Sequence, residues 1–478
     1  MWENTTSNLL IEATAGSGKT STSVELMKRT PSHLDGMYVA FNKHIVEEIK
    51  LKNTPSNFTI GTLHSRGYQS IAMNHRGKFK LEDWKTFRLL QSIAKNWKDV
   101  KRNKLNAKIS NVADFYNYYR LTNQTDLSNF EDIVVKYDLN VNSNDLPKIR
   151  ESLKVLNDYN SRHNSHVEFM IDFVDMIYLP VNLNFTVKQV DVLMIDEAQD
   201  LSALQHAFIK KLLKPNGRMA IVGDPNQSIY GFSGSDIESW QKFKTLENTI
   251  ELPLSYCYRC GKNIVQKANY VHNVMESPDW MHDGEVIEDG NLLYVKSGDF
   301  VLCRNTKPLV KLYFDFLTLE KPCYIKGSEI GKGLVKALEE FKNLTSIDTL
   351  TAMQKELNEI YKFLITHGVQ QPQKHPKYIS YNEKMEIIEL FSWKYKTTKE
   401  IIDTINRIFA DKGEGIVLST IHKSKGLETD DVYFYLPSLI PSKYAVKDWE
   451  KEQEINLLYV AITRAKKTLI FVNNEYSL

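Results

Sequence analysis

The chain has 478 residues, 42% of them hydrophobic and 25% charged, and a formal net charge of +2 at pH 7. This length exceeds what one hydrophobic core supports and predicts two to four domains. The small net charge indicates no class of partner, so any nucleic-acid site has to arise from local charge patterning. No apolar run is long enough to span a bilayer, and the N-terminus lacks the basic-then-apolar order of a signal peptide. We therefore expect an intracellular protein, in the cytoplasm or nucleoid of a cell, in a host cell or in a nucleus.

The four cysteines, Cys257, Cys260, Cys303 and Cys323, do not form the pattern of a disulfide framework, which fits a reducing compartment. The spacing of Cys257 and Cys260 matches the first half of a zinc or iron–sulfur site. No second close pair follows, so inert thiols are the favoured interpretation and a metal site is the alternative.

A glycine-rich segment near the N-terminus predicts a phosphate-binding loop between an apolar strand at 9–11 and a helix over about 21–28. Its residues are Ala13, Thr14, Ala15, Gly16, Ser17, Gly18, Lys19 and Thr20, and Ser21 follows in the first turn of the helix. The glycines allow backbone N–H groups to point at an anion, and the helix N-terminus adds partial positive charge. Lys19 is expected to reach the β- and γ-phosphates, and the Thr20 hydroxyl to ligate Mg²⁺. The alternative is a chance Gly/Ser turn.

Two further buried strands follow, at 37–40 and from Phe58, and polar or aromatic groups stand at their ends. Ligands of parallel α/β sheets bind at the carboxyl ends of strands. After the first strand come Phe41, Asn42 and Lys43, where Phe41 could stack on a base and Lys43 could meet a phosphate. Thr62 and His64 stand at the end of the second strand. An ordinary strand-to-helix cap is the alternative.

Residues 66–165 are polar and mostly helical in pattern, and they read as an insertion. From Arg76 to Lys108 there are eleven Lys or Arg residues against three Asp or Glu, and four aromatic residues are interleaved: Phe79, Trp84, Phe87 and Trp97. From Asp114 to Asp145 six acidic residues stand against two basic ones. A basic, aromatic-bearing insertion fits contact with a nucleic-acid backbone. A solvated helical face with its aromatic residues in a small core fits equally well.

Residues 169–177 predict an amphipathic helix, and 190–195 a buried strand that ends in Asp196 and Glu197. A carboxylate in this position can hold the Mg²⁺ shell, here Asp196, and the next one, Glu197, can activate the attacking water. A helix over about 203–213 and a strand at 219–222 follow. In the loop after this strand Gln227 could sense the γ-phosphate, while Tyr230 and Phe232 face a nucleic-acid strand.

These segments resemble the UvrD/Rep-like (PcrA-like) helicases of superfamily 1. The resemblance rests on ATAGSGKT at 13–20, DEAQD at 196–200, GDPNQSIYGF at 223–232, YR at 258–259, STIHKSKGLE at 419–428 and LYVAITRAKK at 458–467. The segment MYVAFNK at 37–43 is nearer to the F-box DNA helicase branch. The resemblance covers both cores, while the insertions match only in position.

The resemblance implies roles for residues in the second half. Arg259 and Arg464 would reach the γ-phosphate, where a guanidinium stabilises transition-state charge, and Glu428 would contact the ribose. Thr420 and His422 would contact backbone phosphates, and Arg304 would lie near the nucleic-acid path. Relatives place an adenine-reading glutamine upstream of the phosphate loop, but the first glutamine here is Gln69. We therefore expect adenine selectivity to rest on another group or to be relaxed.

The fold that follows is α/β, with two RecA-like cores, each a parallel sheet between helices with a mainly helical insertion. We assign the first core to 1–65 and 166–255 and its insertion to 66–165. The second core takes 256–335 and 413–478, and its insertion 336–412 is smaller than in the bacterial relatives. A helix is expected over 454–466, carrying Arg464, and no appended nuclease domain.

The resemblance implies a monomeric ATP-dependent DNA helicase that uses ATP and Mg²⁺ and has no membrane partner. It would move 3′-to-5′ on single-stranded DNA and unwind duplex junctions, with partners from replication, repair or recombination. One alternative is a translocase that displaces proteins with little unwinding. Another is a nucleotide-gated binding module with vestigial hydrolysis, against which the complete set of acid, glutamine and arginine residues argues. RNA as the strand is a further alternative, because stacking and backbone contacts barely distinguish the sugars.

Overall fold

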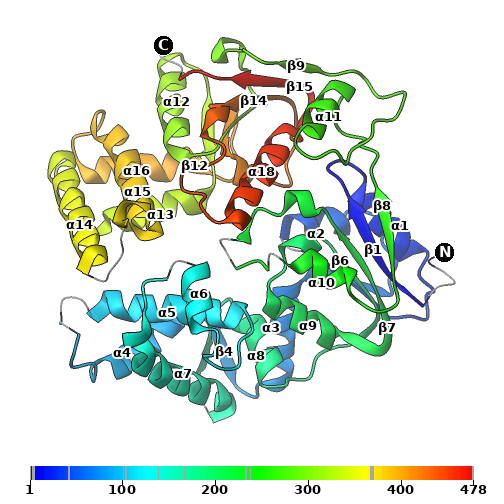
Figure 1. Ribbon diagram of the computed structural model, residues 1–478, viewed down its shortest axis with the longest axis horizontal. Helices are drawn as coiled ribbons and strands as arrows, with labels where there is room; N and C mark the ends of the chain where they lie inside the picture. The colour runs from blue at the N-terminus through cyan, green and yellow to red at the C-terminus, as the bar shows by residue number, and fades with distance from the viewer. Residues whose placement is uncertain are drawn as a thin grey trace. The chain divides into compact units, whose positions relative to one another are not determined.

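The computed structural model describes residues 2, 6–40, 43–100, 102, 105–137, 139–165, 168–231, 234–236, 238–366 and 371–475. The chain divides into two compact units, one of residues 1–14 and 18–254 and one of residues 15–17 and 255–478. Each unit is built on its own sheet (Figure 1). In the ranges given above, no helix is both long enough and apolar enough to cross a membrane.

The sheet of the first unit has six strands in the order β3-β2-β6-β7-β1-β8, all paired in parallel. Their bounds are β1 (Asn8–Ala13), β2 (Gly36–Ala40), β3 (Phe58–Thr62), β6 (Val190–Ile195), β7 (Leu213–Gly223) and β8 (Thr249–Leu254). The central strands are near-continuous apolar runs because helices cover both faces of a parallel sheet. The strand order makes β6, β7 and β1 neighbours, so the loops after them meet at one edge.

Helices α1 (Lys19–Lys28) and α2 (Lys43–Lys50) pack in one core cluster of this unit. A second cluster holds α3 (Leu63–Asn74), α8 (Asp175–Asn182), α9 (Ala203–Leu212) and α10 (Ser239–Lys244). Helices α3 and α8 approach closely at Gly67, where a Cβ atom would lie 1.8 Å from the Met176 carbonyl oxygen. Only glycine fits at this crossing.

The insertion of the first unit forms its own apolar core from α4 (Lys85–Ala94), α5 (Leu105–Leu121), α6 (Phe130–Lys136) and α7 (Leu146–Ser161). Trp97 is buried in this core and Phe87 packs against it, whereas Trp84 is 49% exposed. At least part of the aromatic pattern in the basic segment is therefore explained by packing.

The predicted amphipathic helix over 169–177 is wrong in its first half. Strand β5 (Glu168–Ile171) occupies that stretch and pairs in parallel with β4 (Lys78–Leu81), and α8 begins only at Asp175. Phe169 and Ile171 alternate inward at the period of a strand, and both are fully buried. The partner strand lies far upstream in the sequence, so local periodicity did not reveal the pairing.

A buried network of charges joins the insertion to the first core. The Lys85 ammonium on α4 donates to Asp175 on α8 at 2.5 Å and to the Asn160 amide oxygen on α7 at 2.7 Å. Arg120 on α5 donates to Asp172 and Asp175 through three hydrogen bonds of 2.8 Å. Although burial raises it, the Arg120 charge brings the pKa of Asp172 down to about 2. The positive charges of two cations therefore compensate the negative charges of two carboxylates, all of them buried away from water.

The sheet of the second unit has seven strands in the order β12-β11-β13-β10-β14-β15-β9, again all parallel. Their bounds are β9 (Glu285–Ile287), β10 (Phe300–Cys303), β11 (Cys323–Lys326), β12 (Phe409–Ala410), β13 (Ile416–Thr420), β14 (Thr429–Tyr435) and β15 (Ala465–Val472). The helices around it are α11 (Lys262–Asn269), α12 (Thr306–Thr318), α13 (Ser328–Leu338), α14 (Ser346–Thr366), α15 (Pro376–Ser392), α16 (Thr398–Ile408), α17 (Ile421–Ser424) and α18 (Asp448–Ile462). The prediction of an α/β fold with two parallel sheets flanked by helices is confirmed.

The C-terminal helix differs from its prediction over 454–466. Helix α18 begins at Asp448, where Glu450 closes a capping box, and it ends at Ile462. Arg464 therefore lies in the turn after the helix, and Ala465 starts β15. The apolar run of β15 is buried against β14, and this sheet pairing ends the helix earlier than the local pattern suggested.

Candidate active site

Three loops follow adjacent strands of the first unit's sheet, at its carboxyl edge. The phosphate loop leaves β1, Asp196 and Glu197 follow β6, and Asp224 and Gln227 follow β7. Because β6, β7 and β1 are adjacent parallel strands, the fold itself brings these groups together at the edge where such sheets bind ligands.

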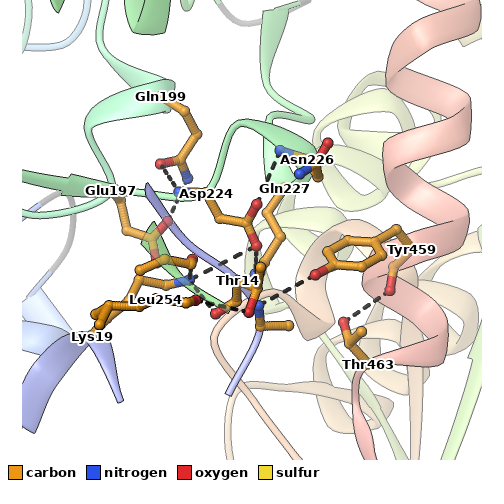
Figure 2. Close-up of polar contacts among 12 residues, drawn as sticks. Thr14, Lys19, Glu197, Gln199, Asp224, Asn226, Gln227, Leu254, Tyr459 and Thr463 are labelled. Carbon is orange, nitrogen blue, oxygen red and sulfur yellow. Dashed lines mark hydrogen bonds and ion pairs between the residues drawn. The ribbon is translucent and has the colours of Figure 1, made fainter. Parts of the chain in front are cut away.

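The phosphate loop has the backbone that its glycines predict. Gly16 and Gly18 have φ angles of 70° and 88°, in the left-handed region, and α1 begins directly after them at Lys19. The Lys19 ammonium donates to the carbonyl oxygens of Ala13 at 2.5 Å and Thr14 at 3.1 Å (Figure 2). It also lies 3.9 Å from a carboxylate oxygen of Asp224. The lysine is thus folded back over its own loop, within reach of an anion held there.

Asp196 and Glu197 occupy a strained turn at the end of β6. Glu197 has φ of 52°, in the left-handed region that a residue with a side chain rarely adopts, and its N–H donates to Asp196 at 2.9 Å. The Tyr38 hydroxyl donates to the other oxygen of Asp196 at 2.5 Å. Burial and the neighbouring Glu197 charge raise the pKa of Asp196 to about 6. Ionising Asp196 therefore costs more than ionising a solvent-exposed carboxyl group, and a neighbouring cation offsets this cost.

Amide side chains connect the acids after β6 to the loop after β7. The Gln199 amide donates to Glu197 at 2.5 Å and accepts the backbone N–H of Asp224 at 3.0 Å (Figure 2). The Gln227 amide in turn donates to Asp224 at 2.7 Å. Burial raises the pKa of Asp224. A change at Gln227 can thus be transmitted through Asp224 and Gln199 to Glu197.

Sequence reasoning assigned no role to Tyr38, Gln199 or Asp224. A signal was present for Asp224, because it follows a buried strand as Asp196 does. Nothing in the local pattern marked Tyr38, which reaches Asp196 from the adjacent strand β2.

The donor set of this edge fits a divalent cation beside phosphates. The Lys19 charge acts on the carboxylates of Asp196 and Asp224, and the Glu197 charge acts on both acids as well. Carboxylate oxygens are the ligands that Mg²⁺ prefers. In the part of the chain that the structure describes, no three His, Cys, Asp or Glu side chains form a metal cluster by themselves. A Mg²⁺ ion here would take the rest of its shell from a hydroxyl such as that of Thr20, from water and from the phosphates.

The two arginines expected at the γ-phosphate have protein partners within the second unit. Arg259 pairs with Glu428 and donates to the Thr463 carbonyl oxygen at 3.3 Å. Arg464 is 1% exposed and donates to the carbonyl oxygens of Val460 at 3.0 Å and Leu427 at 3.1 Å. Glu428 also lies 3.0 Å from the Lys466 ammonium. Contacts of Arg259 and Arg464 with phosphate, and of Glu428 with ribose, stay predictions.

Residues 15–17 of the phosphate loop group with the second unit through specific contacts. The Ala15 N–H donates to the Tyr459 hydroxyl at 3.3 Å (Figure 2), and the Gly16 carbonyl oxygen accepts the Tyr258 N–H at 2.9 Å. A Cβ atom on Gly16 would lie 2.5 Å from the Cβ of Arg259 and 3.0 Å from the sulfur of Cys257. The absence of a side chain at Gly16 is therefore required both by its φ angle and by this packing.

The residues expected to touch a nucleic-acid strand in the first unit have structural partners. Thr62 is the N-cap of α3, and its hydroxyl oxygen accepts the Ser65 N–H at 3.1 Å. The His64 ring stacks on Phe173 at 3.8 Å between centroids, and burial lowers its pKa to about 4. A histidine with so low a pKa carries no charge at pH 7. Tyr230 is half-buried in the loop after β7.

The residues of the second unit that were expected to contact a nucleic-acid strand are also paired with or buried among protein groups. Arg304 holds Glu454 with both its Nε and an Nη atom, the shortest contact being 2.7 Å. Burial and the charge of Arg304 lower the pKa of His422 to about 3, and Thr420 is 8% exposed at the end of β13. Phe41, Asn42 and Phe232 lie outside the described residues, as does the side chain of Lys43. Contact of all these residues with a strand stays a prediction.

Two family models match this chain. Residues 1–247 match the UvrD/REP helicase N-terminal domain, and residues 334–476 match the UvrD-like helicase C-terminal domain.

Two curated relatives match almost the whole chain. F-box DNA helicase protein 1 of Schizosaccharomyces pombe is 27% identical over 97% of this chain and 55% of its own length. F-box DNA helicase 1 of Gallus gallus is 23% identical over 96% of this chain and 47% of its own length. The chain thus spans about half the length of these relatives. Among solved structures, the Arterivirus nonstructural protein 10 helicase is 11% identical with a TM-score of 0.34, covering 98% of this chain and 59% of its own.

Proposed function

The chain belongs to the UvrD/REP helicase family, and from that premise we propose that it is an ATP-dependent DNA helicase. In this proposal it hydrolyses ATP, moves 3′-to-5′ along single-stranded DNA and separates the duplex ahead of it. The observation that carries the proposal is the meeting of the phosphate loop, Asp196 with Glu197, and Asp224 with Gln227 at the ends of three adjacent strands.

The phosphate-loop residues from Ala13 to Ser21 would hold the nucleotide. Backbone N–H groups around Gly16 and Gly18 would face the phosphates, and Lys19 would exchange its loop carbonyl partners for phosphate oxygens. Thr20 and Asp196 would hold Mg²⁺, which neutralises phosphate charge when bound. A cation beside Asp196 also removes the cost of ionising that buried acid.

Glu197 is the residue that we assign to the attacking water. Its strained backbone and its hydrogen bond from Gln199 fix the carboxylate in one orientation. A positioned carboxylate accepts the proton of the water as the bond to phosphorus forms. Gln227 would sense the γ-phosphate and, through Asp224 and Gln199, bias the position of Glu197.

Coupling to a strand would use the loop after β7. Gln227 is buried in this loop and donates to Asp224, and half-buried Tyr230 stands three residues later. A ring that stacks on a base can therefore pull on the same short segment that reads the γ-phosphate. This arrangement supports stimulation of hydrolysis by single-stranded nucleic acid.

The test is the rate of ATP hydrolysis with and without single-stranded DNA, alongside unwinding of duplexes that carry a 3′ or a 5′ single-stranded tail. We expect strong stimulation and unwinding from the 3′ tail only. In Tyr230→Ala, stimulated turnover should fall more than basal turnover, because a lost base stack costs about 1–3 kcal/mol.

The other outcomes separate the alternatives. Stimulation without unwinding of either duplex would replace the helicase by a translocase. Stimulation of ATP hydrolysis by RNA but not by DNA would make RNA the strand on which the protein acts. Binding of ATP without hydrolysis under any condition would leave a nucleotide-gated binding module. Equal loss of basal and stimulated turnover in Tyr230→Ala would make Tyr230 structural.

A further inference from the structure

Two cysteines stand on either side of Arg259, and the fold turns both inward. Cys257 and Cys260 are fully buried. Tyr256, just before them, is 48% exposed, and Tyr258, between them, is 57% exposed. The backbone N–H of Cys260 donates to the sulfur of Cys257 at 3.3 Å. The segment thus forms a tight turn with two thiols on its inner side, just before α11.

The environment of the turn favours a reactive thiolate at Cys257. Hydrogen bonding from the Cys260 thiol and the charge of Arg259 lower the pKa of Cys257 to about 6, despite its burial. The charged groups that face the pair are the guanidinium groups of Arg259 and Arg464. The thiols of Cys303 and Cys323 differ, since burial raises the pKa of each to about 12.

We propose that Cys257 and Cys260 form a reversible disulfide when the protein meets a peroxide, and that this bond weakens nucleotide binding. The Cys257 thiolate attacks one peroxide oxygen and becomes a sulfenic acid, while the other oxygen leaves as water after taking a proton. The Cys260 sulfur then attacks the Cys257 sulfur and expels a second water as it loses its own proton. Two thiols lose two electrons, and one hydrogen peroxide is reduced to two water molecules. Reduction by an external dithiol reverses the change.

The consequence for the nucleotide follows from what the turn touches. The Cys257 sulfur lies against Gly16, and the Tyr258 N–H holds the Gly16 carbonyl oxygen. Cys260 donates weakly to the Thr463 carbonyl oxygen at 3.8 Å, the same oxygen that accepts from Arg259. Drawing the two sulfurs together shifts both the support of the phosphate loop and the backbone that carries Arg259. This second half rests on the proposed nucleotide site, whereas formation of the disulfide does not.

The experiment treats the full chain with hydrogen peroxide and maps the disulfide by differential alkylation and mass spectrometry. We expect a Cys257–Cys260 bond, with Cys303 and Cys323 still alkylated as thiols. The rate of its formation should rise with pH through about 6 and then level, rather than climb toward the ordinary thiol pKa of about 8.5. Affinity for a fluorescent ADP analogue should fall about tenfold or more and recover with dithiothreitol.

Matched variants separate the two halves of the proposal. Cys260→Ser and Cys260→Ala should form no such bond and keep their ADP-analogue affinity in peroxide, while Cys323→Ser should behave as the unaltered chain does. Absence of the Cys257–Cys260 bond under peroxide would overturn the disulfide itself. A mapped bond with unchanged analogue affinity would overturn its effect on the nucleotide. Failure of the reduced protein to bind the analogue at all would instead count against the proposed nucleotide site.

Discussion

The first unit contains two buried clusters of charge that are arranged in opposite ways. In the network of Lys85, Arg120, Asp172 and Asp175, two cations meet two carboxylates, and the pKa of Asp172 falls to about 2. At the edge of the sheet, Asp196, Glu197 and Asp224 meet Lys19, and burial raises the pKa of Asp196 to about 6.

The two clusters differ in what their charges favour: the balanced cluster stabilises the fold, whereas the cluster with excess carboxylates favours binding of a cation. Balanced charges in a dry place stabilise one arrangement of helices, and breaking them leaves an uncompensated ion. Carboxylates in excess favour a neighbouring cation, and such perturbed pKa values are frequent at functional sites. Both clusters look similar in sequence, as acids near apolar residues.

The largest effect is expected from Lys19→Ala, which removes the ammonium from the acid-rich cluster. ATP hydrolysis should fall by about a thousandfold, since a positioned cation on transferring phosphate contributes on that scale. The free energy of unfolding should fall less than in the buried-pair variant described next, because Lys19 hydrogen-bonds only loop carbonyl groups and lies 3.9 Å from Asp224. Exposed Lys28 in the last turn of α1 supplies the control as Lys28→Ala. Near-normal turnover in Lys19→Ala would refute the phosphate-loop assignment.

The next effect is on stability, from Asp175→Asn in the balanced cluster. It leaves the buried Lys85 ammonium without its carboxylate and should cost about 3–5 kcal/mol in urea unfolding. The matched control is Asp158→Asn on α7, whose pair with Arg162 is largely exposed. That change should cost less than about 1 kcal/mol. Similar losses in both variants would contradict the comparison.

A smaller, pH-dependent effect is expected from Asp196→Asn. Since the folded pKa of Asp196, about 6, lies above its ordinary value, the unaltered chain loses stability as pH rises toward 6, and the loss persists above it. Without Mg²⁺, the variant should therefore be more stable than the unaltered chain by about 1–3 kcal/mol at pH 8 and by about half as much at pH 5.

The opposite behaviour of Asp172→Asn sharpens this test. The pKa of Asp172 is already lowered to about 2, so its stabilising charge is present at pH 5 and at pH 8 alike. This variant should be destabilised equally at both values. If Asp196→Asn also showed no pH dependence, the acid-rich character of the site would be wrong.

The smallest effect should come from Lys85→Met combined with Asp175→Asn. The pair removes one cation and one anion together and leaves Arg120 with Asp172. We expect a loss of only about 1–2 kcal/mol, well below the sum of the two single variants. Additive losses in urea unfolding would show that charge balance is not what stabilises the cluster.

The sequence predicted those features that depend on neighbouring residues. The apolar runs before Lys19, Asp196 and Asp224 are visible in one strand each, and parallel order then brings their ends together. The pairing of Arg120 with Asp172 was not visible, because fifty-two residues separate them. The role of Phe169 in β5 was missed for the same reason, as its partner strand is distant.

The sequence also did not reveal the protein partners of the residues that were predicted to bind a nucleic-acid strand. A histidine such as His64 or His422 carries no sign in the sequence that burial will lower its pKa to about 4 or about 3. Nor does Arg304 show that Glu454, on a distant helix, will hold it. Residue type and spacing indicate which chemistry is present, whereas its protonation and its partners depend on tertiary packing.

The short ribbon of β4 and β5 makes the insertion of the first unit a replaceable module. Its entry strand and its exit strand are hydrogen-bonded to each other, with Lys78 opposite Glu168 and Leu81 opposite Ile171. The chain therefore departs at Leu81 and returns at Glu168 over a gap of about 10 Å, three strand residues in length. Because the two strands are parallel, the connection between them needs about a dozen residues or more, which is far shorter than the present insertion. The helices between β4 and β5 can thus differ in number and length without changing where the chain leaves and re-enters the first unit, provided that the buried charges of Asp172 and Asp175 stay balanced.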